Sequence, residues 1–87
     1  MPEFSIHEIT IAVTDIDAAA ATIAAAFHGV VDPVQEFPQG SFELRMGGVW
    51  IGDFHIAMVS SPVGKGPVGK FLERRGQGLY EVNVRTD

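Results

Sequence analysis

The segments Ile6 to Val13 and Leu79 to Val84 share one residue pattern, and this repeat constrains the fold more than any other feature of the chain. In both segments an aliphatic residue is followed by a ring-bearing residue, a glutamate, and an alternation in which every second side chain is Ile or Val. A period of two in β-branched residues is typical of a strand that is buried on one face. Both segments are therefore predicted to be strands.

The alternation also divides each predicted strand between a core face and an open face. The predicted core side chains are Ile9, Ile11 and Val13 in the first strand and Tyr80, Val82 and Val84 in the second. The predicted open-face side chains are Glu8, Thr10 and Ala12 in the first strand and Glu81, Asn83 and Arg85 in the second.

Length and composition limit the class of protein. With 87 residues the chain is predicted to be a single domain, and without cysteine it has no disulfide and no thiolate metal site. A net charge of -5, with only 6 scattered basic residues, argues against nucleic-acid binding. The longest apolar run, within Ala18 to Phe27, is too short to cross a bilayer and has no basic flank, so a cytoplasmic protein without a membrane partner is expected. A hydrophobic content of 46% is high for so short a chain and favours contact with another subunit.

A helix is predicted directly after the first strand. Asp15 and Asp17 offer N-caps, and Ala18 to Phe27 consists mainly of alanine, the strongest helix former. His28 and Gly29 are expected to end this helix, with the glycine as the residue that follows its last turn. The predicted apolar stripe is Ile16, Ala20, Ile23 and Phe27.

From Val30 onward, Pro and Gly residues cut the chain into short extended segments, which is typical of an antiparallel meander. The predicted strands are Val34 to Phe37, Phe42 to Ile51 with a bulge at Gly47-Gly48, and Phe54 to Ser60. A short helix is expected to begin at Pro67 and to end at Arg74 to Gly76. The order indicates an α+β fold: a βαβββ unit over residues 1–63, a linker helix over 64–78 and an extra strand over 79–87.

Glu8 and Glu81 are the candidate metal ligands. They occupy the same place in the repeated pattern, so they could bring two carboxylates to one side of one sheet, and hard divalent cations prefer oxygen ligands. Spacing alone favours the simpler interpretation, two solvated glutamates on a polar face. His55 is predicted on the open face beside Ala57, whereas His7 is predicted on the core side and His28 at a helix end.

These features together resemble the glyoxalase, bleomycin-resistance and dioxygenase superfamily, also called the vicinal-oxygen-chelate superfamily, whose βαβββ module is normally paired with a second module. The methylmalonyl-CoA epimerase family is the most similar. Ile6 to Val13 is similar to its strand I-D-H-I-A-I-A-V, and Gly66 to Leu79 is similar to its segment S-P-I-A-K-F-L-E-K-R-G-E-G-L, which joins the two modules. The resemblance spans nearly the whole chain but only the first half of a family member, which implies that residues 79–87 are the first strand of an absent second module.

The departures from the family fall on its chemistry. The resemblance implies a divalent metal as cofactor, held by two histidines, a Glu or Gln in the fourth strand, and a late glutamate. Here Glu8 and Glu81 stand at the histidine positions, Ala57 stands at the fourth-strand position, and the last ligand would lie beyond the chain. No residue is assigned as the catalytic base.

Three hypotheses follow. The first is a small-molecule-binding module that forms a cup as a homodimer, with a degenerate metal site. The second is a divalent-metal-dependent epimerase, isomerase or lyase assembled across the dimer, and the third is a gene fragment.

The dimer is expected because a single module leaves the edge of its first strand unpaired. In addition, the last strand follows the flexible Gln77-Gly78 segment, which could let this strand cross to a partner. The predicted ligand-binding residues are Thr10, His55, Asn83 and Arg85.

Overall fold

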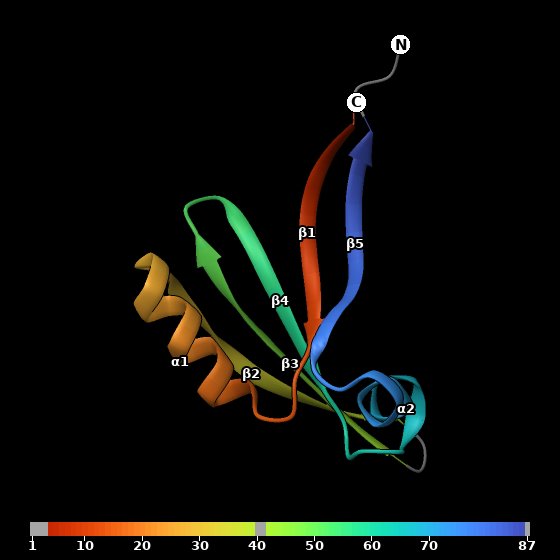
Figure 1. Cartoon of the computed structure of the whole chain (residues 1–87). Coiled ribbons are helices and arrows are strands. Elements are labelled where there is room, and N and C mark those ends of the chain that lie inside the picture. Colours follow the sequence, from red (N-terminus) through yellow and green to blue (C-terminus); the bar gives the residue numbers. More distant parts are fainter. Residues whose placement is uncertain (1–3, 40–41, 87) are drawn as a thin grey trace.

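The chain folds into one five-stranded mixed sheet with a helix on each face (Figure 1). The computed structural model describes residues 4–39 and 42–86. In chain order the elements are β1 (Phe4–Ala12), α1 (Ile16–Phe27), β2 (Val30–Gln39), β3 (Phe42–Ile51), β4 (Phe54–Ser60), α2 (Gly66–Arg75) and β5 (Gly78–Thr86). The strand order is β2-β3-β4-β1-β5, and β1 runs parallel to β4 while every other neighbouring pair is antiparallel. The predicted α+β architecture is confirmed.

Helix α1 is held at its start by the predicted cap and along its length by the core. The Asp15 side chain accepts a hydrogen bond from the amide of Ala18 at 3.1 Å, which satisfies one of the free amides of the first turn. Ile16 and Ala20 are almost fully buried and pack on the sheet with Val49 and Met58. This cluster fixes α1 across β2, β3 and β4.

The C-terminus of α1 differs from the prediction in the residue that turns the chain. His28, not Gly29, adopts the left-handed conformation, with φ 56°. Gly29 is needed for a different reason, because a Cβ there would lie 2.5 Å from the Val49 side chain and 2.9 Å from the carbonyl oxygen of Trp50. The glycine therefore permits a close approach of the α1–β2 connection to β3.

Helix α2 covers one end of the other sheet face. Pro67 lies in its first turn, as predicted, and Val68 and Leu72 pack on Ala12 and Val59. Tyr80 joins this cluster through an edge-to-face contact with Phe71, whose ring centroid is 5.1 Å away. The rest of this face is left open by α2.

Strand β2 is longer than predicted and carries the irregularity that was expected in β3. It begins at Val30, and its pairing with β3 shifts between Asp32 and Gln35, opposite Gly47. Pro33 lies inside this bulge, where the missing N–H of a proline costs no ladder hydrogen bond. The bulge therefore lets one strand continue through a proline that the sequence analysis treated as a break.

Strand β5 occupies the edge of β1, so the prediction that this edge is unpaired is wrong. Figure 1 shows β1 and β5 as a long two-stranded ribbon that extends beyond β4. The side-chain oxygen of Gln77 accepts hydrogen bonds from the Thr14 amide at 2.9 Å and from the Thr14 hydroxyl at 3.1 Å, which ties the start of β5 to the end of β1. The exposed edge of the sheet is consequently that of β5, together with that of β2.

A register shift between Thr10 and Ile11 corrects the predicted face of Tyr80. Glu81 pairs with Thr10, and the next pair is Leu79 with Ile11, so Tyr80 is the extra residue of a bulge. It turns toward α2 and not, as predicted, toward the face of Val82.

In the part of the chain that the structure describes, neither helix is long and apolar enough to cross a membrane.

Candidate functional site

The sheet face opposite α1, here called the open face, is defined by cross-strand rows of side chains. Residues directly opposite each other in neighbouring strands lie on the same face. One row consists of Val30, Trp50, His55, Glu8 and Asn83, and the next consists of Asp32, Gly48, Ala57, Thr10 and Glu81. The predicted open-face positions Glu8, Thr10, His55 and Glu81 thus come together.

At the centre of the open face, His55 lies between two carboxylates. Its Nδ1 is 2.5 Å from Oε2 of Glu8, and its Nε2 is 2.7 Å from Oδ2 of Asp32. The imidazole side chain is 14% exposed, against 25% for Glu8 and 35% for Asp32. We call these three residues the His55 cluster.

Gly48 makes the long reach of His55 possible. His55 is on β4 and Asp32 is on β2, so the imidazole must pass over β3, which lies between them. A Cβ at Gly48 would lie 2.6 Å from Nε2 of His55 and 2.6 Å from the carbonyl oxygen of Ile56. The ring therefore occupies the space that any other residue at position 48 would fill.

Trp50 covers the imidazole from the side of the β3–β4 turn. The two ring centroids are 4.4 Å apart with an interplanar angle of 32°, and Trp50 remains 41% exposed. The tight turn at Gly52 and Asp53 sets this pair, because residues equidistant from a two-residue turn oppose each other in a hairpin. The half-exposed indole forms an apolar wall beside a polar centre.

The His55 cluster can hold and exchange protons. A neutral imidazole carries one N–H, so both contacts are N–H to carboxylate hydrogen bonds only when the ring is an imidazolium. In the neutral ring, one carboxylate instead meets an unprotonated nitrogen, unless that carboxylate is itself protonated. The chemistry available here is acid–base exchange between one ring and two carboxylates.

The divalent metal that the resemblance implies does not fit these residues. Glu8 and Asp32 contact opposite edges of the His55 ring, so the three side chains do not converge on one point. Within residues 4–39 and 42–86, no group of three or more His, Asp or Glu side chains is placed to hold an ion. Glu8 and Glu81 lie on paired strands of the open face, where Glu8 is opposite Asn83 and Glu81 is opposite Thr10. The Glu8 carboxylate, however, already contacts His55.

The other predicted ligand-binding residues lie near the cluster. Thr10 is on the open face but is only 6% exposed, and Glu81 is exposed. The backbone register places Asn83 opposite Glu8 and Arg85 opposite Ser5, while the side chains of Asn83 and Arg85 lie outside the described part of the structure.

Sequence reasoning missed Asp32 and Trp50. Trp50 could have been found by counting outward from the Gly52-Asp53 turn, which pairs it with His55. Asp32 gave no such signal, because its contact depends on a side chain that reaches over a third strand.

The arrangement of elements matches solved structures of larger proteins. A hypothetical protein from Bacillus halodurans C-125 superposes with a TM-score of 0.76 at 20% identity, over 94% of this chain and 58% of that chain. Methylmalonyl-CoA epimerase from Mycobacterium tuberculosis gives a TM-score of 0.70 at 20% identity, over 88% of this chain and 51% of that chain. A mutant of 4-hydroxymandelate synthase from Streptomyces coelicolor gives 0.80 at 16% identity, over 95% and 27%. The chain has the glyoxalase-like fold. The predicted likeness to the vicinal-oxygen-chelate superfamily is thereby confirmed at the level of fold.

The glyoxalase-like chain is a small module relative to these structures. It spans 58% or less of each of the three proteins named above. No protein-family model matches the sequence, and no curated protein matches it significantly.

Proposed function

We propose that this glyoxalase-like module binds a small molecule on its open face, above the His55 cluster, and that two copies of the chain form a shared cup. The observation that carries the proposal is the position of His55. A partly buried imidazole joined to two carboxylates, beside a half-exposed tryptophan, lies at the centre of a sheet face that α2 covers at one end only. A few polar groups surrounded by apolar surface are typical of small-molecule sites.

The second copy is supported by the free edge of β5 and by the apolar residues along it. Leu79 is 57% exposed and Val82 is 43% exposed. Both pair with β1 residues of the α1 side, Ile11 and Ile9, whereas α1 packs mainly on β2, β3 and β4. An exposed β-branched edge invites a further strand, and an identical chain would close it with a two-fold interface. In this arrangement residues 79–87 serve as the first strand of the second half of the cup.

The test has two parts. Sedimentation equilibrium at micromolar concentration should give twice the chain mass of 9.4 kDa. A fragment screen followed by amide NMR shifts, run in the presence of EDTA, should identify ligands whose shifts map to the open face. His55→Ala should weaken those ligands. Ligands that map only to the α1 side would contradict the site, and a native 9.4 kDa monomer would contradict the shared cup.

A second candidate function is a divalent-metal-dependent epimerase, isomerase or lyase assembled across the dimer. The observation that favours it is the register, which places Glu8 and Glu81 on neighbouring strands of the open face. Calorimetry with cobalt or nickel tests it: if the wild type gives a heat of binding, Glu8→Ala should abolish that heat. Two carboxylates leave most of the coordination shell to water, so weak binding or none is the expected result. Binding that survives Glu8→Ala would contradict this assignment of the ligands.

A further inference from the structure

In the two rows that define the open face, carboxylates outnumber cationic groups among the side chains that the structure describes. In the rows that define this face, the ionisable side chains within the described part are the carboxylates of Glu8, Asp32 and Glu81 and the imidazole of His55. Even a fully protonated ring would offset only one of the three carboxylates. The described side chains of these two rows therefore carry net negative charge in either state of His55.

No lysine or arginine whose side chain the structure describes lies in these two rows. Arg45 lies on the α1 side. Its Nη2 is 3.9 Å from Oδ2 of Asp17, and its Nε is 3.4 Å from Oε1 of Glu36. The Nε is buried and makes no hydrogen bond within the described part of the structure. Four more are exposed on α2 or at its N-cap: Lys65, Lys70, Arg74 and Arg75. The side chain of Arg85 is outside the described part.

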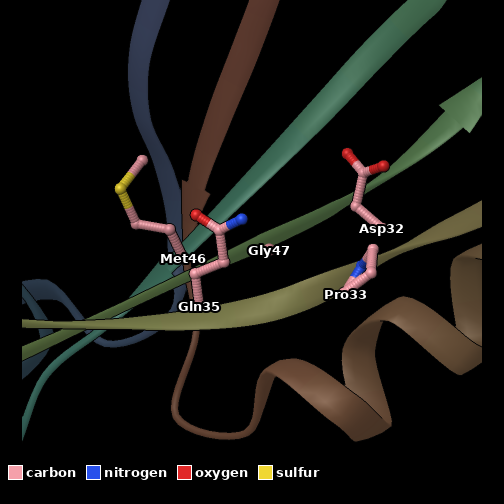
Figure 2. Close-up of a pocket in the computed structure, with 5 residues that line it drawn as sticks. All are labelled: Asp32, Pro33, Gln35, Met46 and Gly47. Atoms are coloured by element: carbon pink, nitrogen blue, oxygen red, sulfur yellow. The ribbon is translucent and has the colours of Figure 1, made fainter.

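Asp32 is the carboxylate that a ligand can reach. One of its oxygens, Oδ2, contacts His55, and within residues 4–39 and 42–86 Asp32 has no other hydrogen-bond or ion-pair partner. Asp32 lines a cavity of about 290 Å³ with Pro33, Gln35, Met46 and Gly47. Figure 2 shows the Asp32 carboxylate and the Gln35 amide standing on the same side of β2, with the Met46 side chain next to Gln35. The cavity arises where the bulge parts β2 from β3.

An apolar surface adjoins this acceptor. Met46 is 38% exposed on the same face, and the exposed indole of Trp50 lies against the ring that Asp32 contacts. A carboxylate beside an aromatic face and a thioether suits a positively charged nitrogen on an apolar body, because the charge pairs with the carboxylate and the body covers the apolar atoms. A carboxylate or phosphate ligand would meet like charge instead.

We infer that the ligand of the open face is an organic amine: its ammonium nitrogen donates to Asp32, and its apolar body lies over Met46 in the cavity that both residues line. This inference rests on the proposed function and adds the chemical class of the ligand. It differs in chemical class from methylmalonyl-CoA, which is bound in one solved structure of methylmalonyl-CoA epimerase.

Three probes of similar size test the charge: benzylamine, benzyl alcohol and benzoate. Trp50 is the single tryptophan of the chain, so its fluorescence reports on the site directly, and amide NMR shifts locate each probe. Benzylamine should bind roughly tenfold more tightly than benzoate, and added salt should narrow the difference.

Asp32→Asn should weaken benzylamine about tenfold while leaving benzyl alcohol within twofold, because it removes the charge and keeps the shape. Glu36→Gln is the matched control: it makes the same charge change on the same strand, but Glu36 pairs with Arg45 of the α1 side. If both variants lost the same affinity for benzylamine, the loss would come from the change in net charge alone, and the assignment of Asp32 as the acceptor would be overturned. Tighter binding of benzoate at the open face would overturn the amine while the binding function stands. No open-face shifts with any probe would overturn the amine inference, and an empty fragment screen would then remove the proposed function as well.

Discussion

Nε2 of His55 lies 2.7 Å from Oδ2 of Asp32 although β4 and β2 are not neighbours in the sheet. The imidazole crosses over β3 at Gly48, and its other nitrogen contacts Glu8 on β1. One side chain thus links three strands of the open face and passes over a fourth. The imidazole is the group that both carboxylates contact. A substitution that fills the space above Gly48 should therefore displace the imidazole and disturb both contacts.

Gly48→Ala should therefore destabilise the fold and displace His55. The new Cβ would lie 2.6 Å from the flexible imidazole and 2.6 Å from the backbone oxygen of Ile56, and the backbone cannot yield as the ring can. Overpacking of this kind costs about 1–3 kcal/mol. Urea denaturation followed by circular dichroism measures the loss, and a change in Trp50 fluorescence of the folded variant reports the displaced ring.

Gly78→Ala is the control for this substitution. No atom lies within 4 Å of a Cβ at Gly78, so the same added methyl should change the free energy of unfolding by less than about 0.5 kcal/mol. If both alanine variants lost the same stability, the loss would come from replacing a strand glycine and not from the space that His55 occupies.

Ile16→Ala should cost more than any change on the open face. Ile16 is fully buried between α1 and the sheet, where it packs in the cluster that contains Val49 and Met58. Truncating a buried isoleucine to alanine costs about 2–5 kcal/mol, a large share of the roughly 5–15 kcal/mol that stabilises a typical domain. Urea denaturation should show a strongly lowered midpoint. Val30→Ala, at a position that is 68% exposed, should leave the midpoint nearly unchanged, and a comparable loss there would contradict the assigned core.

The periodic elements could be predicted from local sequence because local physics determines them. The alternation in β1 and β4 placed Glu8 and His55 on the face opposite α1, and Asp15 was predicted and found as the cap of α1. The cross-sheet contact of Asp32 could not be predicted, since it requires the register of β2, β3 and β4 together with the gap above Gly48.

The place of β5 was also beyond local reasoning. Its strand pattern was evident, but either free edge of the sheet, or a partner chain, could have accepted it. At the start of β5, the side-chain oxygen of Gln77 accepts hydrogen bonds from the amide and hydroxyl of Thr14, across the end of β1. Gln77-Gly78 was predicted to be a flexible hinge, whereas in the structure Gln77 ties the start of β5 to the end of β1.

Gln77→Ala should therefore loosen β5 more than it destabilises the domain. It removes the acceptor for the amide and hydroxyl of Thr14, both at exposed positions, so the global cost should be only about 0.5–1 kcal/mol. Hydrogen exchange should show faster exchange at β5 amides such as Val82, with little change in β3 or β4. Gln77→Glu keeps an acceptor oxygen and should retain most of the protection. Unchanged exchange in Gln77→Ala would show that pairing with β1 alone holds the strand.

The β5 edge should be the dimer interface, and Val82→Lys should dissociate it. Val82 is 43% exposed on the outermost strand, so a lysine there would place a charge in a strand-to-strand contact with an identical chain, where the two-fold axis doubles the penalty. Sedimentation equilibrium should give a dimer for the wild type and a 9.4 kDa monomer with native circular dichroism for the variant. Val30→Lys makes the same change at a 68% exposed position of β2, the opposite edge of the sheet, and should leave the dimer intact. Dissociation by Val30→Lys but not by Val82→Lys would move the interface to β2, and the two open faces would then no longer meet through β5.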